Sequence, residues 1–285
     1  MTPLQEFWHY FKRNKGAVVG LVYVVVMIVI AVFANFLAPY NPADQFRDSL
    51  LAPPFWQDGG SMAHLLGTDD VGRDILSRLM YGARLSLLVG CLVVVLSLIL
   101  GVVLYGTRPG NLFENAVVYR ILDIIVNIVR PIPFIIFLAA MQPLTIVVVG
   151  TSIGTVAAIF PMVVMCTFAT SRLVEQNLVP VDPGVIEAAR SMGAGKLTII
   201  RTVLIPEALA PLILAYAFLF IGVLDMSAMA GYIGGGGLGN FAIAYGYQKF
   251  DQTVTWTAVI IMIVLVQVVQ GIANAIAKRL LKRQQ

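Results

Sequence analysis

Three charged side chains, Asp123, Arg130 and Asp225, stand within long apolar runs of the sequence. A charge inside a membrane is costly unless it faces water or a polar partner. Asp123 and Arg130 are seven residues apart, so a helix would carry both on one face, about 10 Å apart along its axis. We predict that these three residues and Ser227 lie along a pathway for a transported substrate. For Asp225, a hydrogen bond between packed helices is the alternative role.

Two glycine-containing runs resemble nucleotide-binding loops but lack the rest of each motif. The run 234–239 satisfies G-x-G-x-x-G, yet no strand precedes it and no βαβ unit surrounds it. The run 193–196 resembles part of a phosphate-binding loop, but Arg190 and Leu197 stand where that loop needs Gly and Ser or Thr. We therefore expect this chain to bind no nucleotide. The run 234–239 is expected to allow close backbone packing or a re-entrant turn.

The sequence offers no spacing typical of a metal site or a catalytic nucleophile. Cys91 and Cys166 both lie in apolar runs, so we predict that they are small buried residues rather than metal ligands or a disulfide. His9 and His64 are far apart in the sequence and show no ligand spacing. The acidic run 66–74 does not place its oxygen ligands as a calcium loop would. We expect that run to cap an external helix.

Composition sets the class of protein. The chain is 59% hydrophobic and 12% charged, with a mean hydropathy of +0.88. An average soluble domain is about a quarter charged. The sequence therefore predicts an integral membrane protein, and the small net charge of +4 reflects loop topology rather than nucleic-acid binding.

Long apolar runs predict an all-α protein with six transmembrane helices. Residues 1–16 form a predicted interfacial amphipathic helix, 39–81 an external polar loop, and 82–285 a core domain that follows the first span. In the third span, Pro131 and Pro133 should kink or break the helix. The six predicted spans are residues 17–38, 84–105, 117–140, 153–170, 208–229 and 254–276, each approximate at its ends.

The distribution of basic residues predicts which loops face the cytoplasm. Lys and Arg are concentrated in every second connection, whereas the intervening loops carry few of them or are acidic. Because cytoplasmic loops are enriched in Lys and Arg, both termini should lie on the cytoplasmic side of the cell inner membrane. The basic segments are 12–15, 107–120, 172–201 and 278–283.

The longest polar interruption among the later spans predicts a helix, a turn and a second helix. Asp182 and Pro183 are typical of an N-cap and a first helical position. Gly193 and Gly195 should then break the helix before a second helical run at 196–204.

This segment resembles the EAA loop of permeases of binding-protein-dependent ABC importers. The family pattern is E-A-A, three residues, G, nine residues and I-x-L-P, and the chain matches it at 187–189, 193 and 203–206 with two conservative departures. The resemblance implies a type I importer fold in which this loop, about 176–206, docks as a coupling helix on a cytoplasmic ATPase. The implied ATPase-coupling residues are Glu187, Ala188, Ala189, Met192, Gly193 and Ala194.

Two subfamilies are recognisable along the chain. Residues 1 to about 104 resemble dipeptide permeases, in the first span, the run 66–74 and the run 81–90. Residues from about 102 onward resemble methionine permeases, although 224–226 is more similar to peptide permeases. The stretches that resemble methionine permeases include 104–110, 126–134, 149–154 and 227–239.

The resemblance implies a non-enzymatic translocation subunit. Its expected partners are a cytoplasmic ATPase dimer that binds ATP and Mg²⁺, a second permease subunit that is identical or related, and a periplasmic binding protein. The implied substrate is methionine or a related amino acid, with a di- or oligopeptide as the alternative. A different class, an ion-coupled secondary transporter, would use Asp123, Arg130 and Asp225 as a relay, but the sequence shows no inverted repeat.

Overall fold

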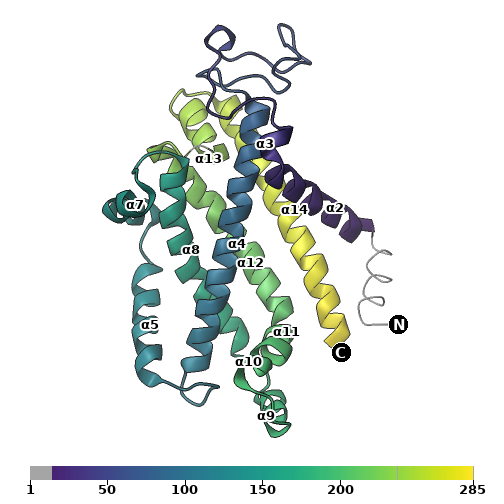
Figure 1. Ribbon diagram of the computed structural model, residues 1–285, viewed down its shortest axis with the longest axis vertical. Helices are drawn as coiled ribbons and strands as arrows, with labels where there is room; N and C mark the ends of the chain where they lie inside the picture. Colours follow the sequence, from purple (N-terminus) through teal and green to yellow (C-terminus); the bar gives the residue numbers. More distant parts are fainter. Residues whose placement is uncertain (1–14, 236, 285) are drawn as a thin grey trace. The chain divides into compact units, whose positions relative to one another are not determined.

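In the computed structural model of the chain, residues 15–235 and 237–284 are described, and this part is helical without a β-strand (Figure 1). An isolated β-bridge joins Thr68 and Asp74. The chain divides into two compact units, Met1–Cys91 and Leu92–Gln285, which we describe separately. Residues 1–14 of the predicted amphipathic helix lie outside the described residues.

The first unit contains the first apolar helix and the polar loop that follows it. Helix α2, Lys15–Val32, is an apolar helix of 18 residues. The helix is interrupted at Phe33, which precedes the short helix α3, Ala34–Leu37. A 3₁₀ turn, η1, Arg47–Ser49, lies within the loop. The long helix α4, Ile75–Thr107, begins in this unit and continues into the second.

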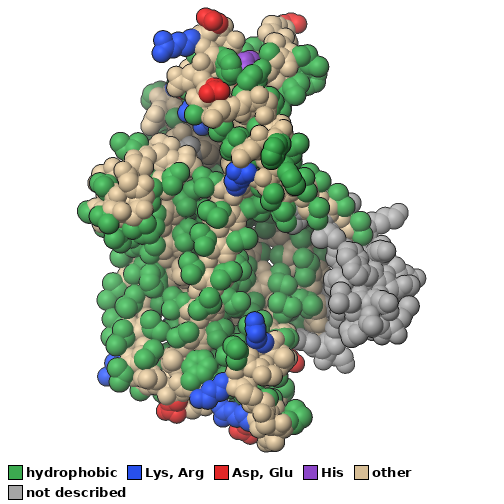
Figure 2. Space-filling view, viewed as in Figure 1, with side chains coloured by type: hydrophobic (Ala, Val, Ile, Leu, Met, Phe, Trp, Pro, Cys, Tyr) green, Lys and Arg blue, Asp and Glu red, His purple; other side chains and the backbone are tan. Residues whose placement is uncertain are grey.

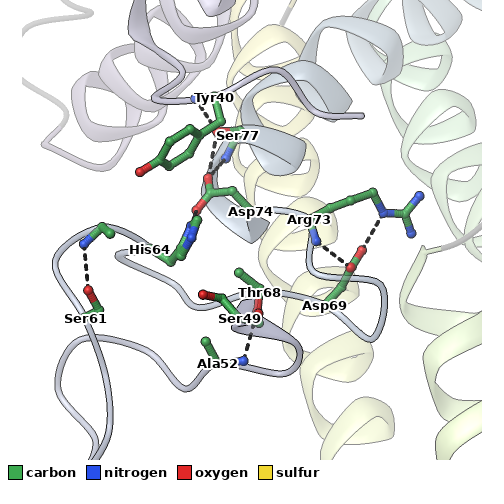
Figure 3. A network of polar contacts seen from close by, with 11 residues as sticks. Tyr40, Ser49, Ala52, Ser61, His64, Thr68, Asp69, Arg73, Asp74 and Ser77 are labelled. Carbon is green, nitrogen blue, oxygen red and sulfur yellow. Dashed lines mark hydrogen bonds and ion pairs between the residues drawn. The ribbon is translucent and has the colours of Figure 1, made fainter. Parts of the chain in front are cut away.

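The polar loop ends at Asp74, earlier than the predicted end at residue 81, because Asp74 caps helix α4. Its Oδ2 atom accepts hydrogen bonds from the backbone N–H and the hydroxyl of Ser77, at 2.8 and 2.7 Å. Oδ1 lies 3.1 Å from Nδ1 of buried His64, and Ser77 Oγ also accepts from the backbone N–H of Tyr40 (Figure 3). The predicted capping role of the acidic run is confirmed at Asp74.

A second set of contacts closes the same loop. Thr68 donates its hydroxyl to the Ser49 carbonyl and accepts from the backbone N–H of Ala52 at 2.9 Å. Asp69 accepts from the backbone N–H of Arg73 at 2.9 Å and pairs with its guanidinium at 2.8 Å (Figure 3). The acids of this run therefore serve as hydrogen-bond acceptors within the loop.

The second unit is a set of packed helices in which α12 contacts both α8 and α14. Figure 2 shows hydrophobic side chains along the lengths of its helices, and Lys, Arg, Asp and Glu side chains at the end where α9 lies. Its longer helices after α4 are α5, Ala116–Val129, α8, Thr155–Leu178, α9, Pro183–Ser191, α12, Leu209–Ala230, and α14, Gln252–Gln284. The shorter helices between them are α6, Phe134–Ala140, α7, Gln142–Val149, α10, Lys196–Ile199, α11, Ile205–Glu207, and α13, Gly237–Phe241.

The predicted break in the third span is confirmed. Helices α5 and α6 are bent by 109° at the Arg130–Pro133 segment, which contains both prolines. Proline removes a backbone donor and clashes with the preceding turn, so the helix cannot run straight through this segment.

Among the described residues, four helices are long and apolar enough to cross a membrane, or five if the bent α5–α6 pair counts as one span. They are α4, α8, α12 and α14. The predicted total of six therefore stays a prediction. Helix α8 also continues to Leu178, beyond the predicted end at residue 170, because Arg172 and Glu175 in its last turns pair with Asp123 and Arg108 on neighbouring segments.

The glycine-rich segment after α12 packs closely against that helix, as predicted. A Cβ atom added to Gly239 would come within 2.3 Å of the Ala228 Cβ atom, and one on Gly231 within 2.5 Å of the Asn240 Cβ atom. A 3₁₀ turn, η3, Gly231–Ile233, and a π-helical segment, η4, Ala242–Tyr247, flank α13 and complete the return to α14.

Candidate functional site

Helix α9 begins where the sequence predicts. Asp182 is the N-cap, and its Oδ1 atom accepts from the backbone N–H of Gly184 at 2.8 Å. Pro183 occupies the first helical position, where its missing N–H leaves no hydrogen bond unmade.

The helix ends in a glycine turn of the Schellman type. Gly193 has φ of 80°, its N–H donates to the Arg190 carbonyl, and the Ala194 N–H donates to the Ala189 carbonyl at 3.1 Å. Glycine takes this left-handed conformation without the steric penalty of a side chain. The turn fixes the direction in which the chain leaves α9.

The two faces of α9 have different environments. Ile186 and Ala189 are buried in the core of the second unit, which attaches the helix to the bundle. Ala194 is half-buried against the same core. The outward face consists of Glu187, Ala188, Arg190, Met192 and Gly193, and the Met192 side chain is 81% exposed. The six predicted coupling residues thus divide between an attachment face and a free face.

The second arm of the loop returns to the bundle as a continuous apolar contact. Helix α10 passes into a π-helical segment, η2, Ile200–Leu204, and then into α11. Ile199, Ile200 and Leu204 are buried in one cluster with the end of α4 and the end of α8. The segment 182–207 therefore rests on the bundle along both arms, while the outward face of α9 stays open.

An ionic cluster adjoins this segment. Its members come from the last turns of α8, the turn after α4, and α5. Arg172 Nη1 is 2.6 Å from Glu175 Oε2 and 2.9 Å from Asp123 Oδ1. The contact with Asp123 is an ion pair, and Asp123 Oδ1 is buried without a hydrogen bond. Arg108 Nη1 lies 3.5 Å from Glu175 Oε1, which also accepts from the Tyr119 hydroxyl at 3.4 Å. Sequence reasoning missed Arg108, Arg172 and Glu175, because it assigned all three to cytoplasmic loops.

The four predicted pathway residues are not brought together. Asp123 belongs to the ionic cluster, whereas Arg130 is exposed at the end of α5. Asp225 is exposed on α12, near the end of that helix farthest from α9, and Ser227 is half-buried two residues later. No hydrogen bond or ion pair links Asp123, Arg130 and Asp225 within the described part of the chain. Cys166 is buried as predicted, but the prediction for Cys91 was wrong, since it lies on an exposed face of α4.

Comparison with known families decides the class. A sequence model described as "Binding-protein-dependent transport system inner membrane component" matches residues 94–282, about two thirds of the chain. The chain belongs to this family. A second model, described as the N-terminal TM domain of oligopeptide transport permease C, matches residues 2–54 of this permease.

Relatives of this permease come from two transport systems. It is 53% identical over 239 residues to the dipeptide transport system permease protein DppC of Escherichia coli K12, covering 83% of this chain and 76% of DppC. It is 44% identical over 180 residues to the probable D-methionine transport system permease protein MetI of Vibrio cholerae, covering 63% of this chain and 80% of MetI. The likeness to DppC must therefore continue well past residue 104.

A solved structure shares the fold. An inward-facing conformation of the MetNI methionine ABC transporter contains a chain that is 42% identical, with a TM-score of 0.66, covering 68% of this chain and 90% of that one. The chain is thus an ABC importer permease with a type I fold, and a multi-pass component of the inner membrane.

Proposed function

We propose that this permease works with a cytoplasmic ATPase that docks on the outward face of α9. The main support is the environment of α9. Ile186 and Ala189 fix one face in the core, and Glu187, Ala188 and Met192 are exposed on the other face. A docking helix needs both properties, since a loose helix would absorb the movement of its partner. In this proposal ATP and Mg²⁺ bind to the ATPase, and this chain binds neither.

The complete importer also includes a second permease subunit, identical or related, and a periplasmic protein that delivers the substrate. The family description, which makes transport dependent on a binding protein, supports the latter partner. Both termini and the α9 segment lie on the cytoplasmic side. The basic residues Arg190, Lys196 and Arg201 support this orientation.

Methionine or a related amino acid is our first candidate substrate. The support is the 42% identity to a chain of the methionine transporter, over 68% of this permease. A dipeptide is the second candidate, supported by the higher identity and wider coverage of the likeness to DppC. Asp225 and Ser227, on the later part of α12, are the proposed pathway residues, and an exposed carboxylate there could bind the amino group common to both substrates.

Uptake by the assembled importer tests these proposals. The chain is purified by an affinity tag with the proteins that accompany it, and is reconstituted with its binding protein in vesicles loaded with ATP. We expect vanadate-sensitive uptake of radiolabelled methionine, and little uptake of radiolabelled alanyl-alanine. The reverse preference would support the second candidate. Uptake that proceeds without ATP, or a purified permease with no accompanying ATPase, would contradict the coupling proposal.

A further inference from the structure

Glu175 occupies an unusual position for a carboxylate in a membrane protein. It is 1% exposed, lies in the last turn of α8, and contacts groups from two other segments. Arg172 reaches it along the same helix, Arg108 from the turn after α4, and Tyr119 from α5. Glu175 is therefore the acceptor that α4, α5 and α8 share.

The charges of this cluster are balanced. Arg108 and Arg172 carry two positive charges, and Asp123 and Glu175 carry two negative charges. Glu175 is buried and its partners are partly exposed, so replacing Glu175 alone leaves an excess positive charge and is expected to be more destabilising than removing a balanced pair. A variant that removes one charge therefore tests charge balance, whereas a variant that removes a balanced pair tests the contact between helices.

The cluster adjoins the segment that carries α9. Val174 and Leu178, on either side of Glu175, are fully buried in the same core cluster as Val181, Ile186 and Ala189. Only residues 179–182 separate the end of α8 from the start of α9. A displacement of α9 can therefore reach α8 through this short connection, as well as the return arm α10–η2, which α9 also contacts.

The end of α4 fits tightly against the same part of α8. A Cβ atom added to Gly101 would lie 2.5 Å from the Val174 Cβ atom and 2.8 Å from the Ser171 carbonyl oxygen. This contact fixes how closely the two helices approach, but it includes no ion pair or side-chain hydrogen bond between them. The Arg108 ion pair with Glu175, at 3.5 Å, and the Tyr119 hydroxyl, which donates to Glu175 at 3.4 Å, oppose sliding of one helix along another, because it would separate opposite charges and break a hydrogen bond.

We propose that Glu175 is a positioning residue for transport, which ties the α9-proximal ends of α4, α5 and α8 into one rigid block. Movement of α9 then moves α4 and α5 together with α8, and reaches the substrate pathway instead of being absorbed locally. This inference rests on the proposed function of α9.

Three variants of the reconstituted importer test the inference. Glu175→Gln removes the charge and leaves a net positive cluster. Glu175→Gln combined with Arg108→Gln restores charge balance, with Arg172 and Asp123 still paired, but leaves α4 without its ionic contact to α8. Arg108→Lys is the conservative control, since it keeps a positive charge facing Glu175. For each variant we would measure ATP hydrolysis, uptake of radiolabelled methionine and alanyl-alanine, and thermal stability.

In the double variant we expect stability to return toward that of the parent while uptake per ATP hydrolysed stays reduced by about fivefold or more. Glu175→Gln alone should lower both the thermal stability and the uptake per ATP hydrolysed. Arg108→Lys should keep most of the uptake per ATP hydrolysed that the parent shows. A double variant that transports as many molecules per ATP as the parent would overturn the inference. If the parent protein shows no ATP-dependent uptake, the proposed function is contradicted. Failure of the proposed function is therefore distinguishable from failure of the inference about Glu175.

Discussion

Gly193 owes its importance to its backbone conformation. Its φ is 80°, and a Cβ atom added there would meet no atom within 4 Å, so only the conformation opposes a side chain. We predict that Gly193→Val strains the turn by about 1–2 kcal/mol. Uptake should fall while expression and ATP hydrolysis persist, as measured in the reconstituted importer.

Two matched variants test whether the left-handed conformation of Gly193 is the cause of the lost uptake. Gly193→Asn should retain more uptake than Gly193→Val, because Asn tolerates the left-handed conformation. Gly195 has φ of −68° and also has free space around it, so Gly195→Ala should transport like the parent. Normal uptake by Gly193→Val would show that the turn does not transmit movement.

Asp69 makes the stability of the polar loop depend on pH. Burial disfavours its charged form, but hydrogen bonds from the Arg73 backbone, the Arg73 guanidinium and the Val71 backbone outweigh this, so the pKa of Asp69 lies below its ordinary value of 3.8. A carboxylate with a lowered pKa adds stability above its unfolded pKa, and this stability is lost as the pH falls through the folded value. We expect pepsin to cut the loop much faster at about pH 2 than at about pH 4.5, beyond the intrinsic pH dependence of the protease.

The Asp69→Asn variant supplies the control for this prediction. It lacks the titrating group, so its loop should be cut faster than that of the parent at about pH 4.5 and show less additional opening at about pH 2. If parent and variant respond equally to acid, another group governs the loop.

The helices show which structural features the sequence could reveal. The start of α9 and the bend between α5 and α6 were predictable, because Asp182, Pro183, Pro131 and Pro133 act on the backbone next to them. The length of α8 was not, because its last turns carry Arg172, which pairs with a residue on α5. Pairing between distant segments leaves no periodic signal in the sequence, so the ionic cluster was missed for the same reason.

Arg84 fastens the first apolar helix to the second. From α4 it donates to the carbonyl oxygens of Ala31 and Val32 at 2.8 and 2.9 Å and to the Asn35 side chain at 3.2 Å. The two carbonyls belong to the last turn of α2, where helix carbonyls lack partners. A guanidinium can reach several acceptors in fixed directions, whereas an ammonium acts as a compact point charge.

We therefore predict that Arg84→Lys lowers the free energy of unfolding by about 1–2 kcal/mol, in equilibrium unfolding of the protein in mixed micelles. Asn35→Ala removes only the exposed acceptor and should have a smaller effect. Equal stability of the parent and Arg84→Lys would mean that lipid-facing contacts, rather than this side chain, hold α2 in place.

The family could be inferred from a short motif, but the division into subfamilies could not be drawn from local matches alone. The pattern at 187–206 is local and matches with only two conservative departures, so it identified the permease class. The resemblance to dipeptide permeases was found in the motifs before residue 104, yet the alignment with DppC covers 83% of the chain. Substrate specificity depends on side chains from several helices facing one pathway, and isolated motifs do not report such an arrangement.

The orientation of the second unit in the membrane connects its charge pattern with its proposed function. Helix α12 leads away from the α9–α11 segment toward α13, so Met192 and Phe250 lie beyond opposite ends of one crossing helix. The segment near Met192 contains Arg190, Lys196 and Arg201, whereas residues 230–251 contain Lys249 as their single Lys or Arg. The excess of basic residues predicts that α9 lies in the cytoplasm.

Cysteine labelling tests this orientation, since the side chains of Met192 and Phe250 are 81% and 87% exposed. In a background with Cys91→Ser and Cys166→Ala, we predict that a membrane-impermeant maleimide labels Met192→Cys in inverted vesicles and Phe250→Cys in intact spheroplasts. The opposite pattern would put the free face of α9 outside the cell, where no cytoplasmic ATPase could reach it. Such a result would contradict both the charge argument and the docking role of α9, whatever substrate the importer carries.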